Sequence, residues 1–365
     1  MKKNRMEALD GVRGLAVIIV LLSHTSGRDQ TLHSSLDFLG IGHVGVYLFF
    51  VLSGYLLMNN LLIEFKNNGS ISLNKYFVRR FFRIAPLYYL VITYVFILQI
   101  YSGEINTKYL HINDGLQGYI KHLIFYKGDS VFWTIPTEVF FYLLLPLIFI
   151  FSIKFHERWI ILMSGLVIFF GIWTLLSISK IVDWIPQPKI IDIKQGSQFL
   201  EVFLIGCMAA FLKEKKWFNK TVLSSQGIII INITAIILLL ATLVFVSKSF
   251  LFFERSYYEL RWFSIVYGII FSLMVVACQQ RGMLNKIFSN KFLIISGLFG
   301  FSIYLIHFEV IRIVNFFDIE PQIKFIISMA FIYSLSFFSY RFVEKPFIDL
   351  SKGFFNQKSV AFDKI

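Results

Sequence analysis

Long apolar runs separated by short polar stretches dominate the pattern of the chain. A membrane helix needs about 20 mainly apolar residues, because the hydrocarbon core is about 30 Å thick and a helix rises about 1.5 Å per residue. Ten runs approach or reach this length: Val12–Thr25, Val44–Ile63, Ile84–Tyr101, Phe132–Ile153, Trp159–Ser177, Phe199–Leu212, Gly227–Val246, Arg261–Gln279, Phe292–Val314 and Ile323–Val343. The pattern predicts an all-α, polytopic membrane helix bundle of about ten transmembrane helices.

The connections between these runs are short, and no internal repeat or low-complexity tract is visible. The longest polar stretches are 26–43, 102–131 and 178–198, and the parts 103–117 and 185–196 carry the Gly, Pro, Asn and Asp of irregular loops. No small-residue cleavage site follows the first run, which we interpret as a retained helix and not a removed signal peptide. We expect one membrane domain over residues 1–350 and a short cytoplasmic tail over 351–365.

The composition supports a membrane location and excludes several other classes. Hydrophobic residues make up 57% of the chain and charged residues only 16%, against about 45–50% and about 25% in soluble proteins. This excludes a cytosolic enzyme, a disordered tail and a secreted disulfide scaffold. The two cysteines, Cys207 and Cys278, lie in apolar runs without the spacing of a disulfide framework or a metal site, so no metal is predicted.

The chain carries a net charge of +13, and in a membrane protein the distribution of this charge indicates the orientation of the helices. If the amino terminus is cytoplasmic and the chain crosses ten times, 23 of the 35 lysines and arginines lie in the inner segments. This bias follows the positive-inside rule and predicts that both termini are cytoplasmic. Much of the positive charge is then a topology signal, and nucleic acid is not an expected partner.

The first run contains the most informative pair of ionisable residues, Arg13 and His24. Charged groups within a bilayer are costly, so they indicate function by default. Eleven residues at 100° each make about three turns plus about 20°, so both side chains project from one face, about 16 Å apart along the axis. The pair indicates a route or cavity along that face. The alternative is that Arg13 extends to the headgroups and His24 bonds a neighbouring helix.

Glu138 lies inside the apolar sequence WTIPTEVFFYLLLP, where a lone carboxylate is costly unless it is paired or protonated. A histidine at similar depth on another helix would be a natural partner, because a carboxylate stabilises the cationic imidazole. The alternative is a structural bond between helices to a tyrosine or serine. Tyr142 in the same sequence is a secondary candidate residue.

Three arginines, Arg79, Arg80 and Arg83, lie within about one turn at a predicted cytoplasmic helix start. Arginine binds phosphate through paired, charge-assisted hydrogen bonds, so the cluster suits a phosphorylated ligand. Topological anchoring explains basic residues there equally well.

Two further positions are secondary candidates. His307 is the other histidine deep in an apolar run, and we interpret it as a core histidine bonded to its neighbours. Ser53 precedes Gly54 in the middle of a predicted helix, where small residues favour close helix packing before any catalytic role.

Six motifs occur in a fixed order: LDGVRGLAVIIVLLSH, GVYLFFVLSGYLL, RRFFRIAPLYY, WTIPTEVFFYLLLP, FSIYLIHFEV and YRFVEKPF. Together they strongly resemble the acyltransferase-3 family of integral-membrane acyltransferases, which includes bacterial acetylases of O-antigen, peptidoglycan and other surface glycans. The resemblance runs from residue 9 to about residue 350. It implies a multi-pass domain in the bacterial cytoplasmic membrane that moves an acyl group, usually acetyl, from coenzyme A to a hydroxyl of a surface sugar, glycan or glycolipid.

The resemblance also assigns roles to residues. The family's signature of an arginine and a histidine separated by ten residues falls on Arg13 and His24, and its acidic position falls on Glu138. The basic motif associated with the coenzyme falls on Arg79, Arg80 and Arg83. Some members carry a further esterase-like domain outside the membrane. We expect no such domain in this chain, so the resemblance implies a stand-alone member, for which a partner protein is one way to present the acceptor.

The chemistry suggests a hypothesis for each residue. His24 would be the general base that removes the proton of the acceptor hydroxyl, and Glu138 would support its cationic form. Arg13 would hold a coenzyme phosphate or polarise the thioester carbonyl, while the three-arginine cluster binds the nucleotide phosphates. An acyl-histidine intermediate is a less favoured variant. The competing classes are a transporter or flippase of a lipid-linked or polar small molecule, and a membrane scaffold without catalysis.

Overall fold

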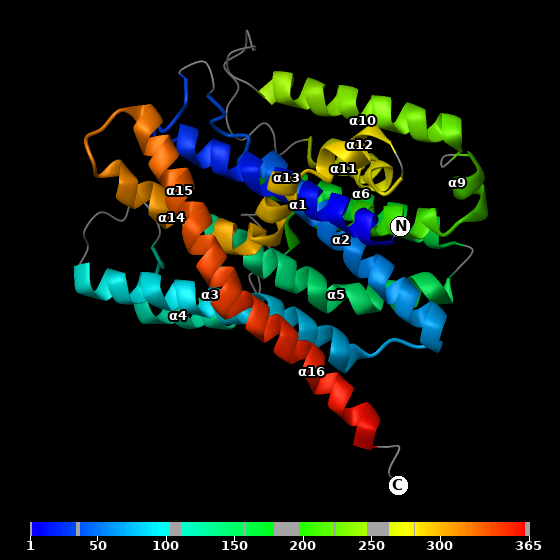
Figure 1. The fold of residues 1–365 in the computed structure, drawn as a ribbon. Coiled ribbons are helices and arrows are strands. Elements are labelled where there is room, and N and C mark those ends of the chain that lie inside the picture. The colour runs from blue at the N-terminus through cyan, green and yellow to red at the C-terminus, as the bar shows by residue number, and fades with distance from the viewer. Residues whose placement is uncertain are drawn as a thin grey trace.

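The computed structural model describes residues 2–33, 37–102, 111–155, 158–178, 197–221, 224–246, 263–280 and 282–361. Every regular element in these ranges is a helix (Figure 1). The α-helices are α1 Lys2–Ser26, α2 Gly42–Asn68, α3 Leu73–Ser102, α4 Gly115–Leu123, α5 Thr134–Lys154, α6 Trp159–Ile178, α8 Leu200–Lys213, α9 Lys216–Thr221, α10 Ser225–Val246, α11 Ser264–Cys278, α12 Met283–Phe288, α13 Lys291–Leu298, α14 Gly300–Asn315, α15 Pro321–Ser339 and α16 Lys345–Ala361. A 3-10 turn, η1 Ser130–Trp133, precedes α5, and a π-helical turn, η5 Tyr340–Glu344, joins α15 to α16.

Six helical segments among the described residues are long and apolar enough to cross a membrane. They are Glu7–Ser26, Gly42–Asn68, Leu73–Tyr101, Ser130–Lys154, Trp159–Leu176 and Pro321–Phe354, and the bent pair α13 and α14 is a seventh if it forms one span. The other predicted runs also coincide with helices, namely α8, α10 and α11. The multi-pass helical character is therefore confirmed, while ten crossings and cytoplasmic termini stay predictions. Within the predicted runs, polar stretches and tail, residues 34–36, 103–110, 179–196, 261, 262 and 362–365 lie outside the described residues.

The predicted run Phe292–Val314 is not one straight helix. It divides into α13 and α14, whose axes differ by 79°. Gly297 and Gly300 flank the break, and Gly297 packs so closely on α1 that an added Cβ would lie 1.8 Å from the backbone oxygen of Asp10. Glycine permits this approach because it has no side chain. As a result α13 follows α1, while α14 turns away beside Arg13.

The last predicted run is longer than its apolar pattern indicates. Helix α15 continues through η5 into α16, which reaches Ala361, so most of the predicted tail is helical. In Figure 1, α16 extends diagonally past α3, which it contacts. The π-helical turn contains Glu344, whose side chain is buried. The turn thus marks a place where a polar residue enters the bundle.

Helix α2 lies at the centre of the bundle and contacts α1, α5, α8 and α11. It meets α8 through two glycines. A Cβ at Gly54 would lie 2.1 Å from the backbone oxygen of Phe203, and one at Gly206 would lie 2.2 Å from that of Val51. The close packing predicted around Gly54 is confirmed. Because backbones meet there, these helices form a rigid wall for the groups on the opposite face of α2.

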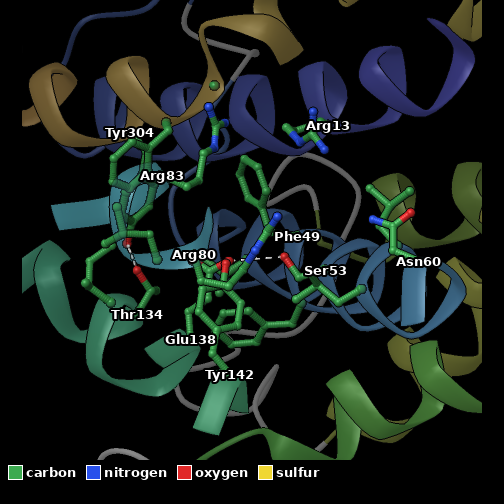
Figure 2. Close-up of a pocket in the computed structure, with 18 residues that line it drawn as sticks. Arg13, Phe49, Ser53, Asn60, Arg80, Arg83, Thr134, Glu138, Tyr142 and Tyr304 are labelled. Atoms are coloured by element: carbon green, nitrogen blue, oxygen red, sulfur yellow. Dashed lines mark hydrogen bonds between the residues drawn. The ribbon is translucent and has the colours of Figure 1, made fainter. Parts of the chain in front are cut away.

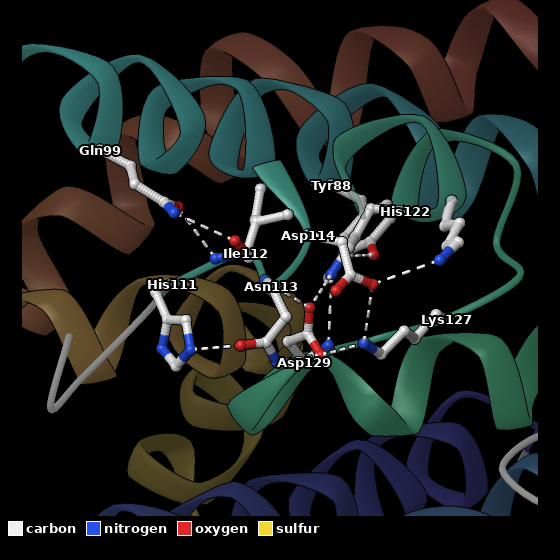
Figure 3. A network of polar contacts seen from close by, with 10 residues as sticks. Tyr88, Gln99, His111, Ile112, Asn113, Asp114, His122, Lys127 and Asp129 are labelled. Carbon is white, nitrogen blue, oxygen red and sulfur yellow. Dashed lines mark hydrogen bonds and ion pairs between the residues drawn. The ribbon is translucent and has the colours of Figure 1, made fainter. Parts of the chain in front are cut away.

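A polar network fastens the far end of α3, away from its arginines, to α4 and the start of α5 (Figure 3). The buried carboxylate of Asp129 accepts hydrogen bonds from the backbone and side-chain nitrogens of Asn113 at 2.9 and 2.7 Å, and pairs with Lys127 at 3.1 Å. His122 lies between Asp129 and Tyr88, at 3.2 and 2.9 Å. Burial alone would raise the pKa of the Asp129 carboxyl, but bonds from His122, Asn113 and Lys127 outweigh burial and hold that pKa below its usual range.

We expect Asp129→Asn to lower the free energy of unfolding by about 1.5–3 kcal/mol at pH 7, the range for hydrogen bonds to a charged group. Because the pKa is depressed in the folded state, this contribution is fully present above about pH 4 and disappears as the pH falls through the folded-state pKa. Thermal unfolding in detergent at pH 7, 5 and 3.5 measures it. The difference from the parent protein should be equal at the first two values and smaller at the third. Asp318→Asn, at an exposed loop position, is the control.

Candidate active site

A cavity of about 280 Å³ lies between α1, α2, α3, α5 and α14. Figure 2 shows polar side chains from these helices converging on it. Six sequence-predicted residues line it: Arg13, Ser53, Arg80, Arg83, Glu138 and Tyr142. The exposed Asn60 lies at one end of the cavity and the buried Tyr304 at the other. The fold thus gathers residues from five helices into one polar chamber within an apolar bundle.

Glu138 supplies the carboxyl group of this chamber. Its Oε1 atom accepts a hydrogen bond of 3.3 Å from Ser53 on α2 and a short one from Tyr142, one turn along α5. The structure places no hydrogen bond or ion pair between Glu138 and His24, both of which it describes. Two hydroxyl groups take the place of the histidine, in agreement with the alternative of a tyrosine or serine, because the start of α5 faces the middle of α2 and not the C-terminal part of α1.

The arginines lining the cavity differ in their partners. Arg13 pairs with Asp10 at 2.6 Å, and Arg83 pairs with Glu344 at 2.9 Å. The guanidinium of Arg80 lies 5.8 Å from the ring centroid of Tyr142 and has no ion-pair partner in the described part of the chain. Arg80 is thus the cation most available to an anionic ligand.

Arg79 does not join the other two arginines of its cluster. It is exposed on another face of α3 and does not line the cavity. A helix turns by 100° per residue, so neighbouring positions point in different directions, whereas Arg80 and Arg83 are three residues apart and share a face. The sequence predicted the cluster but not this division.

The ion pair between Arg83 and Glu344 ties α3 to the turn between α15 and α16. Glu344 is 2% exposed and also receives a short hydrogen bond from Ser302. We expect Glu344→Ala to cost about 1–3 kcal/mol of unfolding free energy, less than a fully buried pair because Arg83 is 26% exposed. A double-mutant cycle with Arg83→Ala, measured by thermal unfolding in detergent, tests the pair. Strictly additive losses would contradict the expected coupling.

His24 and His307 form a second group, beyond the Tyr304 end of the cavity. Their ring centroids are 5.1 Å apart, and the ring of Tyr304 is 5.8 Å from that of His307. Arg13 packs on Gly300 at the start of α14, with 3.6 Å between its Cγ and the position of an added Cβ. Arg13 and His24 therefore both face α14, in agreement with their eleven-residue spacing.

Several polar residues of the bundle were not singled out from the sequence. Glu344 stands in the motif YRFVEKPF and Glu201 in a run of α8, so the rule that singled out Glu138 could have found both. Glu201 is fully buried and accepts hydrogen bonds from Ser264 at 2.7 Å and Thr174 at 2.9 Å. Tyr304, which bonds Thr134 at 2.9 Å, had no sequence signal because it resembles any core tyrosine.

No group of three or more His, Cys, Asp or Glu side chains is placed to hold a metal ion in the ranges that the structure describes. The ionisable residues of the cavity are instead arginines and one glutamate, each on a different helix or helix turn. Such a set suits an anionic organic ligand, because guanidinium groups bind phosphate and carboxylate oxygens in paired hydrogen bonds.

Comparisons with known proteins agree with the motifs. The chain is 27% identical to the peptidoglycan O-acetyltransferase OatA of Listeria monocytogenes over 375 residues, which cover 95% of this chain and 57% of the relative. It is also 27% identical to O-acetyltransferase OatA of Staphylococcus aureus strain NCTC 8325 over 381 residues, covering 98% of this chain and 58% of the relative. The chain thus spans less than two thirds of the length of these relatives. No solved structure matches it.

The family comparison covers most of the helices that form the cavity. The model of the acyltransferase domain matches residues 6–341, which include Arg13, His24, Glu138 and the arginines of α3. The resemblance inferred from six motifs is thereby confirmed over nearly the whole chain. This protein belongs to the acyltransferase-3 family.

Proposed function

We propose that the chain is an O-acyltransferase of the bacterial cytoplasmic membrane, which moves an acetyl group from cytoplasmic acetyl-CoA to a hydroxyl of a cell-surface glycan. The observation that carries this proposal is the convergence of Arg13, Arg80, Arg83 and Glu138 on one cavity. We further propose ten crossings with both termini cytoplasmic, so that the arginine end of α3 faces the donor. The relatives named for peptidoglycan O-acetylation favour a cell-wall acceptor.

The donor suits the shape and charge of the cavity. Its volume of about 280 Å³ is near the lower end of small-molecule pockets, about 300–1,000 Å³. We infer that it admits the narrow thioester arm while the nucleotide stays at the mouth, near Asn60. Arg80, which lacks an ion-pair partner in the described ranges, would bind a coenzyme phosphate there. Arg13 and Arg83 would add positive potential while their carboxylate partners hold them in place.

The transfer requires a base at the acceptor hydroxyl. The acceptor oxygen forms a bond to the thioester carbonyl carbon, the carbon–sulfur bond breaks, and the proton of the hydroxyl passes to His24. The coenzyme leaves as a thiolate, which takes a proton to become the free thiol. Glu138 is then assigned to the donor cavity, where it orients Ser53 and Tyr142. A partner protein that presents the acceptor is compatible with this scheme.

The decisive experiment mixes the full chain, purified in lipid nanodiscs, with acetyl-CoA and soluble peptidoglycan fragments. We expect release of free thiol that depends on the fragments, together with a mass increase of one acetyl group on them. If thiol release did not depend on the fragments and the fragments gained no acetyl group, the protein would not be an O-acyltransferase. A transporter or flippase would move its cargo across vesicles without producing either signal.

We expect Arg80→Ala to raise the KM for acetyl-CoA by about 10- to 100-fold, since a lost charge-assisted phosphate contact is worth about 1.5–3 kcal/mol. The kcat should change little, because the contact is the same in the ground state and the transition state. Initial rates at varied acetyl-CoA concentration measure both constants. Arg158→Ala, which removes an exposed arginine outside the cavity, is the control. Equal KM values for the two variants would exclude Arg80 from donor binding.

A further inference from the structure

One nitrogen of His307 is buried without a hydrogen-bond partner. His307 is fully buried, and its Nδ1 atom lies 2.7 Å from the backbone oxygen of Tyr304 and 3.1 Å from that of Ile303. Its Nε2 atom has no partner in the described part of the chain. A buried polar atom left unpaired destabilises the fold, so it needs an explanation.

The backbone contacts fix the tautomer of this ring. A carbonyl oxygen can only accept, so Nδ1 of His307 carries a hydrogen and donates it. In a neutral imidazole the other nitrogen then has a lone pair. His307 therefore presents Nε2 as a fixed acceptor inside the bundle, held by the turn of α14 that begins at Ile303.

The ring of His24 is placed to supply the missing donor. Centroids 5.1 Å apart allow one nitrogen of each ring to reach hydrogen-bond distance after a small rotation. No hydrogen bond to the imidazole of His24 restrains this rotation among the described residues. Phe308 also contacts the His24 ring, with 5.4 Å between centroids, and the guanidinium of Arg28 lies 4.1 Å from the Phe308 ring centroid.

Burial separates the roles of the two histidines. His24 is half-buried, whereas His307 is 0% exposed. Only His24 can meet a substrate without a rearrangement of α14. Glu138, the expected partner of His24, is occupied by Ser53 and Tyr142, so the group that orients His24 must be another one.

We propose that His307 is a positioning residue, which accepts a hydrogen bond from one nitrogen of His24 on Nε2 and so leaves the other nitrogen of His24 free as the base. This inference rests on the proposed function, because His24 acts on an acceptor hydroxyl only in an acyltransferase. His307 on α14 would thus orient the catalytic histidine, as a carboxylate does in a Ser-His-Asp triad. It also accounts for the buried, unpaired nitrogen.

Two isosteric variants distinguish positioning from a structural role. In His307→Asn the amide can keep the donor near Nδ1 and removes the acceptor at Nε2. In His307→Gln the longer amide can place its oxygen near Nε2 and loses the bond to Tyr304. Positioning predicts that the Asn variant loses on the order of 10²-fold in kcat with unchanged KM for acetyl-CoA, while the Gln variant stays within about 10-fold of the parent.

A structural role predicts the opposite order, with the Asn variant active and the Gln variant impaired, and this result would overturn the proposal. Loss of folded protein in both variants, judged by size-exclusion chromatography, would assign His307 to stability and overturn it too. In a His24→Ala background, His307→Asn should cause no further loss of kcat, and an equal further loss would contradict action through His24. The parent enzyme is assayed alongside. If the parent transfers no acetyl group, the proposed function fails as well, whereas an active parent with a fully active Asn variant refutes this inference alone.

Discussion

Replacing His24 with alanine is expected to lower the kcat of acetyl transfer by on the order of 10³-fold, within the range known for general bases. The half-buried imidazole lies next to His307, beyond the Tyr304 end of the arginine-lined cavity. In the proposed reaction, the acceptor hydroxyl and the donor thioester meet there. Without a base, the hydroxyl must attack with its proton in place. The KM for acetyl-CoA should change little, because the donor is bound by groups around α3. Thiol release at varied acetyl-CoA concentration measures both constants.

His111→Ala is the matched control for this variant. His111 bonds Asn113 at one edge of the network in Figure 3 and does not line the cavity. It should therefore keep parental turnover. A folded, membrane-inserted His24→Ala variant with parental turnover would show that His24 is not the base. Incubation with labelled acetyl-CoA without acceptor separates direct transfer from an acyl-histidine, because only the second leaves label on the protein, and only when His24 is present.

The second large effect concerns folding. We expect Gly54→Ala to destabilise the bundle by about 3 kcal/mol or more, at or above the upper end for overpacked cores. The added Cβ would lie 2.1 Å from the backbone oxygen of Phe203, and a backbone atom cannot turn aside as a side chain does. Helices α2 and α8 would have to separate, which moves the Ser53 side of the cavity as well. The yield of monodisperse protein and the Tm in detergent report the loss.

Gly165→Ala provides the comparison, because no atom lies within 4 Å of the position of its added Cβ. Gly165 is on α6, and alanine favours a helix over glycine by about 1 kcal/mol. This variant should equal or exceed the parent in Tm. If Gly54→Ala were as stable as Gly165→Ala, the close contact of α2 with α8 would not stabilise the fold.

The sequence predicted well those properties that depend on neighbouring residues. Apolar length located the helices, because the cost of exposing backbone groups to lipid applies to every run separately. Gly54 was correctly interpreted as a packing residue from its small size. Arg13 and His24 were correctly placed on one face, since helical geometry fixes this from spacing alone. The six motifs identified the family, because their residues and their order can be recognised along the chain without knowing how the helices pack.

The same reasoning could not predict how residues on different helices meet. For Glu138 the sequence left two kinds of partner open, a histidine or else a tyrosine or serine, and the structure has the second kind. The choice could not be made from the sequence, because the contact with Ser53 depends on the angle at which α2 meets α5. The bend between α13 and α14 was not visible in a continuous apolar run, because its cause is the contact of Gly297 with the backbone of α1.

The sequence by itself therefore determined the helices, their likeness to a family of membrane acyltransferases and the chemical types of residue available within the bilayer. Only the tertiary structure decided that the face of α3 with Arg80 and Arg83 borders a cavity, and that His307 stands beside His24 with one nitrogen unpaired. Spacing along one helix is fixed by local geometry, whereas partners on separate helices are selected by packing, which sums contacts over the whole bundle.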